Sequence, residues 1–447
     1  MTQLYAEARP PASVLFPGDA AWDEARTAWN LAVDQRPAAV AIPASADEVA
    51  EVVRWASAEG LRVAAQGTGH GAAALGDLGD TVLVKLHELR GVSVDPAART
   101  ARVAAGSIWI EVVEAAAEHG LAALAGSSPD VGVVGYVLGG GLSFLARKHG
   151  LAANHVAAIE LVAADGQLRR VEREHDADLF WALRGGGGSF GVVTAVELAL
   201  LPLESVYAGH LWFPVERARE VLRAWRDWTE TVPDEVTSVG RILQLPRIPE
   251  IPEPVRGNSY AVVQAVYAGD ELGEMDRQLE PLRALGPAMD TFRVTPMREL
   301  SQLHMDPDHP VPGHGDGGTL DLLTDETIDV FVEGVVGKPI LAAEIRHLGG
   351  AVARPDARHG AASAFAAPYL MYAVGMAPTP EAKAAVAAAV HELVDALEPW
   401  ASAHTYLNFA ESTRDARTLW TEAAYRRLVR IKEEVDPGDL FRANHPL

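Results

Sequence analysis

The stretch RVAAQGTGHG, residues 62–71, decides the fold. A predicted strand over residues 61–65 runs directly into a loop in which glycines alternate with Thr68 and His70. Residues 69–74 (GHGAAA) match the G-x-G-x-x-A pattern of dinucleotide-binding folds. That fold needs a crossover helix before the next strand, but the next predicted strand begins at Thr81 and leaves no room for one. We therefore reject a Rossmann unit and expect a different cofactor-binding fold.

Two more glycine clusters follow, at residues 126–141 (GSSPDVGVVGYVLGGG) and 184–191 (RGGGGSFG). Glycine lets the backbone pass close to a ligand and lets several N–H groups converge on an anion. Tight packing of helix on strand explains any single cluster equally well. Three clusters in one part of the chain favour a large phosphate-bearing cofactor threaded between loops.

Helix and strand signals divide the chain into two parts of different character. In the first part we expect a capped helix from Ser45 to Gly60, a helix over 108–119, strands 81–86 and 191–201, and hairpins 92–94/101–104 and 159–163/167–171. In the second part we expect strands 209–213, 238–245, 260–267, 341–347 and 369–375, helices 215–231, 271–285 and 381–397, and a loop over 304–318. Residues 406–447 predict a short strand and a helix over 415–434.

Composition narrows the class of protein. The 447 residues carry 38 Lys and Arg against 61 Asp and Glu, a net charge of −23, which argues against nucleic-acid partners and anionic membranes. The chain has no cysteine, which excludes disulfides, thiolate nucleophiles and Cys-ligated metals. We see no signal-peptide pattern and no apolar run of the roughly 20 residues that span a membrane, and we expect a cytoplasmic protein.

A metal site is not expected. His304, His309 and His314 lie in the predicted loop with Asp306, Asp308 and Asp316, but their spacing fits no compact metal-ligand pattern. We interpret this segment as a loop at the mouth of a pocket.

Four segments of the chain resemble one known family. They are residues 62–71, 131–151 (VGVVGYVLGGGLSFLARKHGL), 178–194 (DLFWALRGGGGSFGVVT), and the C-terminal pieces YLNF (406–409) and VDPGDLFRANHPL (435–447). Together they resemble the berberine-bridge-enzyme-like branch of the vanillyl-alcohol-oxidase superfamily. The resemblance implies an α+β, two-lobed PCMH-type FAD-binding fold. The FAD-binding lobe would span 1–205, a substrate-binding lobe with a helix-covered antiparallel sheet 206–399, and a segment returning to the FAD lobe 400–447.

The resemblance also assigns roles to residues. His70 falls on the histidine that bonds the flavin 8α-methyl group, although taken alone it is explained as well by an ordinary loop histidine. Val193 falls where the family holds the adenine end, and Asn154 falls where it often has Asp. The other positions on cofactor-contacting segments are Gly67, Thr68, Gly69, Gly71, Ser128, Val131, Gly132, Gly135, Gly140, Gly141, Tyr406, Asn408 and Asn444.

Three departures from the family pattern affect function. Ser128 stands where many members bond the flavin a second time through Cys, so only a single histidyl link to FAD is expected. Phe409 replaces the tyrosine that often serves as catalytic base, and a phenyl ring cannot accept a proton. Ala367 and Pro368 stand where members often carry His-Arg, which implies a smaller and more apolar pocket wall.

The catalytic base therefore stays open between several residues. Tyr406 is retained, but packing explains it as well, and Tyr136 lies beside the glycine run. Glu344 and Arg346 alternate on a predicted strand and share one of its faces. If that face covers the flavin, they can act as base and anion anchor; the alternative is a surface salt bridge.

The implied reaction takes a hydride from a substrate C–H to flavin N5 while a proton leaves an adjacent O–H or N–H. The electrons then pass to molecular oxygen. We expect a small-molecule substrate, a secondary metabolite, because the pocket residues depart from the sugar-oxidising pattern. A dehydrogenase with another acceptor, a flavin-binding protein without turnover and, third, a nicotinamide dehydrogenase remain as alternatives, and the oligomeric state is left open.

Overall fold

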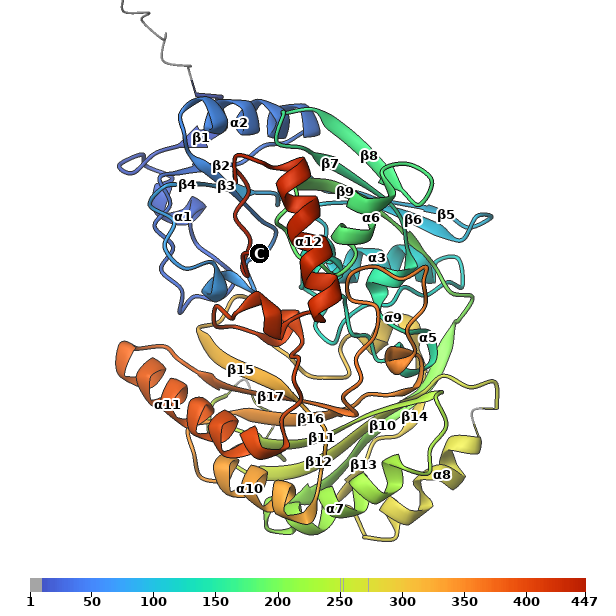
Figure 1. Ribbon diagram of the computed structural model, residues 1–447. Coiled ribbons are helices and arrows are strands. Elements are labelled where there is room, and N and C mark those ends of the chain that lie inside the picture. Colours follow the sequence, from blue (N-terminus) through green and yellow to red (C-terminus); the bar gives the residue numbers. More distant parts are fainter. Residues whose placement is uncertain (1–9, 250, 252, 272) are drawn as a thin grey trace, which may run out of the picture.

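A computed structural model describes residues 10–249, 251, 253–271 and 273–447. Within these residues the strands form sheets of four, five and eight strands (Figure 1). The two smaller sheets lie in one half of the molecule, and the large sheet with its helices forms the other. The predicted α+β, two-lobed architecture with a helix-covered antiparallel sheet is confirmed.

The four-stranded sheet carries the His70 loop. Its order is β1 (Val14–Leu15), β2 (Ala39–Ala41), β4 (Thr81–Lys85), β3 (Arg62–Gln66), and β4 runs parallel to both of its neighbours. Helix α2 (Ala46–Ala58) starts at the Ser45 cap as expected, and the short helix α1 (Trp22–Ala25) lies earlier in the chain. Between β3 and β4 there is only the 3-10 turn η1 (Ala72–Leu75), so no crossover helix follows the glycine loop.

The five-stranded sheet is antiparallel throughout. Its order is β5 (Val92–Asp95), β6 (Thr100–Ala104), β9 (Val192–Ala199), β7 (Val156–Val162), β8 (Leu168–Glu172), and both predicted hairpins are confirmed. The helices of this half are α3 (Trp109–Ala117), α4 (Val133–Leu138), α5 (Ala146–His149), α6 (Ala177–Leu183) and α12 (Glu422–Val435), with η2 (Ala152–His155). Helix α12 packs beside α6 and brings the C-terminal segment back to this half (Figure 1).

The large sheet forms the second half. Its order is β13 (Met289–Asp290), β10 (Ser205–Pro214), β12 (Ser259–Tyr267), β11 (Val236–Gln244), β16 (Ala342–His347), β17 (Tyr369–Met376), β15 (Gly313–Leu320), and β14 (Arg293–Pro296) also pairs with β10. The helices are α7 (Ala218–Thr229), α8 (Glu274–Arg283), α9 (Met297–Leu300), α10 (Asp325–Val335) and α11 (Pro380–Leu397), with η3 (Val215–Arg217), η4 (Gly350–Ala353) and η5 (Glu398–Trp400). The sequence did not predict β15 or α10, and the loop expected over 304–318 is wrong from Gly313 onward.

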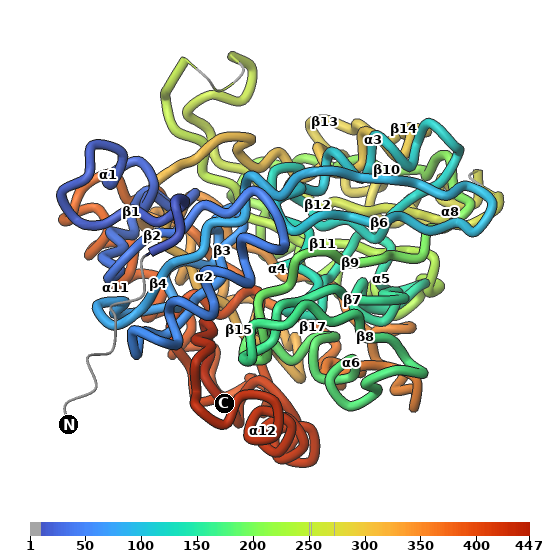
Figure 2. Tube along the Cα trace, turned by 90° about the horizontal axis from the view of Figure 1, so that it is seen from above, coloured from blue at the N-terminus to red at the C-terminus, as the bar shows by residue number. Residues whose placement is uncertain are grey.

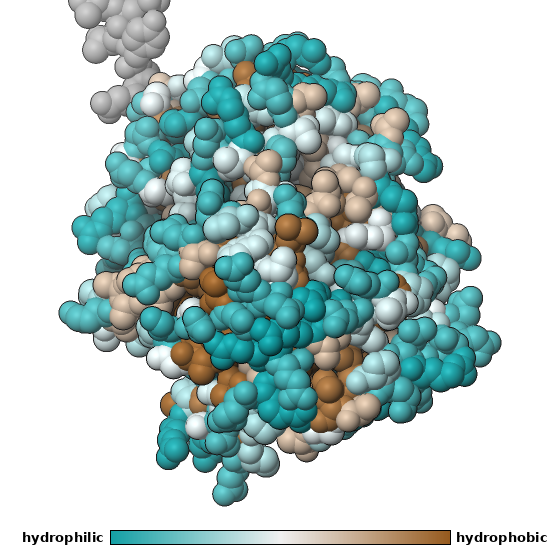
Figure 3. Space-filling model, turned by 60° about the horizontal axis from the view of Figure 1, so that its bottom comes forward, coloured by the Kyte–Doolittle hydropathy of each residue, from teal (hydrophilic) through white to brown (hydrophobic). Residues whose placement is uncertain are grey.

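The two faces of the large sheet differ in chemistry. One face carries buried apolar side chains such as Val263, Ile345 and Met371, and it packs on α7, α8, α10 and α11. The outer surface of this layer is mostly hydrophilic, with apolar side chains in small separate groups (Figure 3). Because strand side chains alternate, the residues between them point to the other face, toward the smaller sheets.

The C-terminal segment differs from its prediction. No strand forms at Tyr406; residues Leu407–Phe409 make the 3-10 turn η6. The predicted helix start at Asp415 is also wrong, because Asp415 caps the separate turn η7 (Ala416–Thr418) and Thr421 caps α12. Beyond α12 the chain lies beside β3, where the Val63 amide donates to the Leu440 carbonyl at 2.8 Å (Figure 2).

Buried apolar side chains gather in two large clusters. One joins the smaller sheets to α12, and the other lies between the large sheet and its helices. The boundaries at residues 205 and 399 stay predictions. Among the described residues, no helix has the length and apolar character that a membrane crossing requires.

Candidate active site

His70 sits at the end of β3 in a half-buried position between three side chains. Its Nδ1 is hydrogen-bonded to the Thr68 hydroxyl at 2.7 Å, and its Nε2 lies 3.6 Å from the Asp130 carboxylate. The Trp29 indole stacks on the imidazole, with ring centroids 3.9 Å apart and planes inclined by 20°. The Trp29 ring N–H donates to the other Asp130 oxygen at 2.5 Å. His70 is therefore held in one orientation by the first and second glycine clusters together.

Two of the glycines around His70, Gly69 and Gly71, have neighbours so close that a side chain would not fit. Gly69 has φ +94°, and a Cβ there would lie 3.0 Å from the Ala28 side chain. A Cβ on Gly71 would lie 2.9 Å from the Asn444 amide nitrogen, which donates to the Gly71 carbonyl at 2.6 Å. Gly67 and Gly132, in contrast, have only ordinary contacts. The predicted return of Asn444 to the glycine loop is seen directly in this hydrogen bond.

Tyr406 and Asn408 hold the second glycine cluster. The Tyr406 hydroxyl accepts from the Leu142 amide and from the Asn408 side chain, each at 3.0 Å, and the Asn408 side chain also donates to the Tyr136 carbonyl at 2.9 Å. A Cβ on Gly139 would overlap the Asn408 side chain. Burial raises the pKa of Tyr406 to about 12, although the hydrogen bonds from Asn408 and Leu142 oppose the rise. The Tyr406 hydroxyl therefore helps to position the second glycine cluster through these hydrogen bonds.

The other predicted residues lie in varied surroundings. Tyr136 packs edge-on against Trp109, and its buried hydroxyl has no hydrogen-bond partner in the part of the chain that the structure describes. Val193 is buried in β9. The Asn154 side chain accepts from the Gly360 amide at 3.0 Å, so it links the two halves of the molecule. Gly140 and Gly141 have positive φ values, and Val131 is half-buried in the same cluster.

Glu344 and Arg346 are buried, with exposed fractions of 4% and 7%, so their interpretation as a surface salt bridge is wrong. The Arg346 Nε donates to Glu344 Oε1 at 2.6 Å, and His304 Nε2 lies 2.8 Å from Glu344 Oε2. Although burial alone would raise it, the charge of Arg346 and the contact with His304 hold the pKa of Glu344 well below its usual range. Arg241, one strand away, lies 3.6 Å from the same carboxylate.

This buried charged cluster faces the second glycine cluster. Arg346 donates to the Ser127 hydroxyl at 3.3 Å, and the Ser128 hydroxyl donates to Asp306. Arg346 also lies over the Phe409 ring, 4.9 Å from its centroid. The polar face of the large sheet thus meets the second glycine cluster and the C-terminal segment at Phe409.

Tyr372 and Glu411 form a second, half-buried pair that the sequence did not predict. Tyr372 lies opposite Glu344 in the β16–β17 register and therefore shares its face of the sheet. Its ring lies 4.7 Å from that of Phe409, and its hydroxyl donates to Glu411. Burial raises the pKa of Glu411 to about 7, although the hydrogen bond from Tyr372 opposes the rise. The signal available in the sequence was the alternation of YLMY (369–372) on a strand beside Glu344.

The histidines of the predicted loop are spread apart. His304 is buried beside Glu344, His309 is exposed, and His314 lies on β15. In the part of the chain that the structure describes, no three His, Asp or Glu side chains are grouped to hold a metal.

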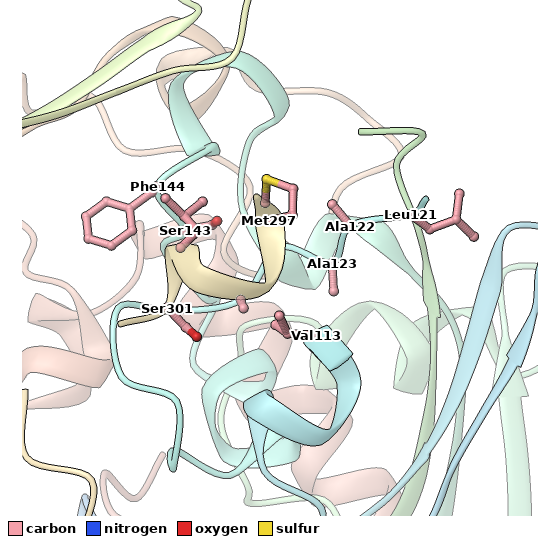
Figure 4. A pocket seen from close by; sticks show the side chains of 11 residues that line it. Val113, Leu121, Ala122, Ala123, Ser143, Phe144, Met297 and Ser301 are labelled. Atoms are coloured by element: carbon pink, nitrogen blue, oxygen red, sulfur yellow. The ribbon is translucent and has the colours of Figure 1, made fainter. Parts of the chain in front are cut away.

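A small cavity lies between α3, α9 and the segment at Ser143 (Figure 4). Its volume is about 10 Å³ and its lining is largely apolar, with Val113, Met297 and Phe144 among the contributors. That space holds one water molecule at most, so it is no substrate site.

Comparison with known proteins agrees with this geometry. The family described as FAD binding domain matches residues 37–172, and the family described as Berberine and berberine like matches residues 405–447. These ranges contain the His70 loop, the second glycine cluster and the C-terminal segment that contacts both. The chain belongs to the berberine-bridge-enzyme-like family of FAD-linked oxidoreductases. The cofactor of this family member is FAD.

Individual relatives of this FAD-linked family member cover almost its whole length. (R)-6-hydroxynicotine oxidase of Paenarthrobacter nicotinovorans is 28% identical, over 97% of this chain and 95% of its own. The structure of wild-type Physcomitrella patens BBE-like 1 has a TM-score of 0.83 at 20% identity, over 97% and 96% of the two chains. Phl p 4, a grass pollen allergen with glucose dehydrogenase activity, has a TM-score of 0.82 at 22% identity, over 98% of each chain.

The residues of this chain fit FAD. His70 Nε2 and Asp130 Oδ1 are buried beside the glycine loop and have no hydrogen-bond partner among the described residues. Gly135 on α4 is exposed, and a Cβ there would meet nothing within 4 Å, which leaves space for a ligand against the helix. Glycine backbone of this kind suits the close approach of a pyrophosphate.

Proposed function

We propose that this chain is an oxidase that removes a hydride from a C–H bond of a small organic substrate and passes the electrons to oxygen. The observation that carries the proposal is the polar face of the large sheet. It presents Arg346 and Tyr372 to the second glycine cluster and to Phe409. Bound FAD would supply the two-electron acceptor, and the protein would supply position and proton transfer.

The proposed proton acceptor is Tyr372 together with Glu411. A substrate O–H or N–H next to the reacting C–H gives its proton to the Tyr372 oxygen as the Tyr372 proton moves to Glu411. A carboxylate with a pKa of about 7 is suited to this step near neutral pH. The pair stands beside Phe409 and therefore replaces the base that Phe409 lacks.

Arg346 is the proposed anchor for a polar or anionic group of the substrate. Its guanidinium contacts Ser127 and the Phe409 ring as well as Glu344. Glu344 has a strongly lowered pKa and three cationic or imidazole neighbours, so it stays ionised and fixes Arg346 rather than taking a proton. We therefore assign Glu344 a positioning role.

The substrate class follows from the walls of this region. The aromatic rings of Phe365, Tyr406, Phe409 and Tyr372 form a continuous series of contacts, with neighbouring centroids 4.7–5.6 Å apart. Such walls favour an aromatic or heterocyclic amine or alcohol of secondary metabolism over a sugar. The relative that oxidises (R)-6-hydroxynicotine supports the same class.

The test is bleaching of the flavin under argon with (R)-6-hydroxynicotine, benzyl alcohols, benzylamines, phenols and D-glucose. Bleaching by an aromatic member with no response to D-glucose supports the proposal. Bleaching by D-glucose alone contradicts the substrate class, and no bleaching by any member supports the alternative of a flavin-binding protein without turnover.

We also propose that FAD is joined covalently to His70. The support is the position of His70 between the two glycine clusters, with Asn444 closing the loop. In acid-precipitated protein the yellow colour should stay in the pellet, and His70→Ala should release it to the supernatant. Retention of flavin by His70→Ala would contradict the link.

The acceptor is oxygen in this proposal, and the alternative is a dehydrogenase with another acceptor. The glucose dehydrogenase activity of the structurally similar Phl p 4 keeps that alternative in view. Reoxidation of the substrate-reduced flavin by air, followed as oxygen consumption, supports an oxidase. Slow reoxidation by air with fast reoxidation by an artificial quinone supports a dehydrogenase. A cytoplasmic location stays a prediction.

A further inference from the structure

We propose that Asp130 and Trp29 are positioning residues for the covalent attachment of FAD to His70. The inference rests on the proposed histidyl link and adds the groups that make His70 reactive. Asp130 follows the Ser127-Ser128-Pro129 segment, and Trp29 lies about forty residues before His70, so only the fold brings them together.

The three side chains form a closed arrangement. The Asp130 carboxylate has one oxygen on the Trp29 ring N–H at 2.5 Å and the other 3.6 Å from His70 Nε2. The Trp29 ring covers one face of the imidazole, and the Trp29 amide donates to the Thr68 carbonyl at 3.0 Å. The indole is thus fixed at both ends, and the imidazole can present only its other face and its Nδ1 edge to a ligand.

Asp130 has an unusual environment for a carboxylate. Its side chain is 15% exposed, and within the described residues no Lys or Arg forms an ion pair with it. A buried carboxylate is normally paired with a cation, because removing its charge from water is costly. Among the described residues, His70 is the only basic side chain with a nitrogen within 4 Å of the Asp130 carboxylate.

The geometry selects which imidazole nitrogen reacts. A carboxylate facing Nε2 favours the tautomer with its proton on Nε2, as aspartate does in other His–Asp pairs. The lone pair then lies on Nδ1, where the Thr68 hydroxyl contacts it at 2.7 Å. Nε2 itself is fully buried. Nδ1 is therefore the nucleophile, and Thr68 holds it until the cofactor replaces that hydrogen bond.

The attachment step balances with oxygen as oxidant. One C–H bond of the 8α-methyl group and the imidazole N–H break, and the C–N bond to Nδ1 forms. Two electrons and two protons pass by way of the flavin to molecular oxygen, which becomes hydrogen peroxide. Alkylation at Nδ1 makes the ring positive until Nε2 loses its proton. The Asp130 carboxylate and the Trp29 ring face both stabilise that charge.

The experiment compares covalent and noncovalent FAD in purified protein. Wild type, Asp130→Asn, Asp130→Glu, Trp29→Phe and the control Asp47→Asn, an exposed aspartate of α2, are incubated with added FAD and sampled over time. Total bound flavin is measured after gel filtration, and covalent flavin after acid precipitation. Asp130→Asn should bind FAD but attach it roughly 100-fold more slowly, since the amide carries no charge to match the imidazolium.

The remaining variants distinguish an effect on the positioning of His70 from a general effect on folding. Asp130→Glu restores the charge and should recover part of the attachment rate, and Asp47→Asn should match wild type. Trp29→Phe keeps a stacked ring but loses the N–H to Asp130, so its rate should fall between wild type and Asp130→Asn. If Asp130→Asn fails to fold, an unchanged rate in Trp29→Phe overturns the inference and a reduced rate upholds it.

The outcomes distinguish this inference from the link on which it rests. Equal attachment rates in wild type and Asp130→Asn overturn the role of Asp130 and leave the His70 link intact. Release of all flavin by wild type in acid overturns the link itself and this inference with it.

Discussion

At the scale of single residues, Phe409 lacks the hydroxyl of the tyrosine that it replaces, and Tyr372 places a hydroxyl beside it. Phe409 has no proton-accepting group, but the Tyr372 ring packs 4.7 Å from it and brings a hydroxyl from the neighbouring strand. Glu411, two residues after Phe409, accepts that hydroxyl. The proposed base, Tyr372, therefore lies on the large sheet, whereas its partner carboxylate, Glu411, lies on the C-terminal segment.

Glu411→Gln should flatten the pH dependence of flavin reduction. A base works when ionised, so in wild type the rate should rise as pH passes through about 7, the pKa of Glu411. The amide still accepts the Tyr372 hydrogen bond but takes no proton, so the rise should disappear and the rate should fall by roughly 100-fold. Anaerobic stopped-flow reduction between pH 5.5 and 8.5, with the best substrate of the panel, measures both.

Glu220→Gln, on the exposed surface of α7, provides the control and should keep the wild-type profile. A Glu411→Gln profile that still rises near pH 7 would contradict the assignment. Tyr372→Phe should show the same loss of rate, since it removes the group that touches the substrate.

The raised pKa of Glu411 also predicts a change in stability with pH. The folded protein holds this proton more tightly than the unfolded chain, so the group favours folding at low pH. That contribution is lost as pH rises from the ordinary glutamate value of 4.5 toward 7. The free energy of unfolding of Glu411→Gln relative to wild type should therefore increase across this window. Urea denaturation at pH 5 and pH 8 tests it, and an unchanged difference would show that Glu411 titrates normally.

At the scale of elements, two glycines differ: Gly139, which caps helix α4, is required by packing, whereas Gly135 within the helix is proposed to leave space for FAD. Gly139→Ala would push a methyl group into Asn408, whose amide is held by Tyr136 and Tyr406, and should cost about 1–3 kcal/mol. Gly135→Ala meets nothing within 4 Å and should leave unfolding unchanged or raise its free energy by up to about 1 kcal/mol. The same methyl should weaken retention of FAD. Urea denaturation and flavin stoichiometry together distinguish the two effects.

The sequence predicts most helices and strands. It misses those in which the residue types are set by contacts with distant parts of the chain and not by the local secondary structure. Strand β15 reads GHGDGGTL, which looks like a loop, yet a Cβ on Gly315 would lie 2.5 Å from the Tyr372 hydroxyl. The glycines of β15 leave room for Tyr372. Because glycines take these positions, the segment lacks the alternating apolar residues that predict a strand. Conversely YLNF alternates like a strand, but its side chains are bound by Leu142, Tyr136 and Arg346 instead.

The residues of the candidate site also fall into two groups, those that the sequence predicts and those that it misses. Alternation on a strand placed Glu344 and Arg346 on one face, and the family motifs placed His70, Asn408 and Asn444, because both signals are local. Trp29, Asp130 and Glu411 gain their importance from partners far along the chain. No periodicity or spacing in a single sequence carries that information.

At the scale of the whole molecule, Arg147 joins the two halves. Its guanidinium leaves α5 and donates to the Val236 carbonyl at 2.7 Å, to the Leu348 carbonyl and toward His347. Arg147→Met removes these bonds and leaves buried carbonyls unpaired, so the free energy of unfolding should fall by about 3 kcal/mol. The exposed Arg36→Met, with its side chain 82% accessible, should change it by less than about 0.5 kcal/mol. Equal urea midpoints for the two variants would contradict this role.

The placement of residues 406–447 has a consequence for biosynthesis. Asn444 closes the His70 loop, Tyr406 and Asn408 fix the second glycine cluster, and Glu411 completes the proposed base. These groups leave the ribosome well after the glycine loops of residues 62–71 and 126–141. A nascent or prematurely ended chain therefore lacks the parts that close the flavin site. We therefore expect stable binding of FAD only after residue 444 has been translated.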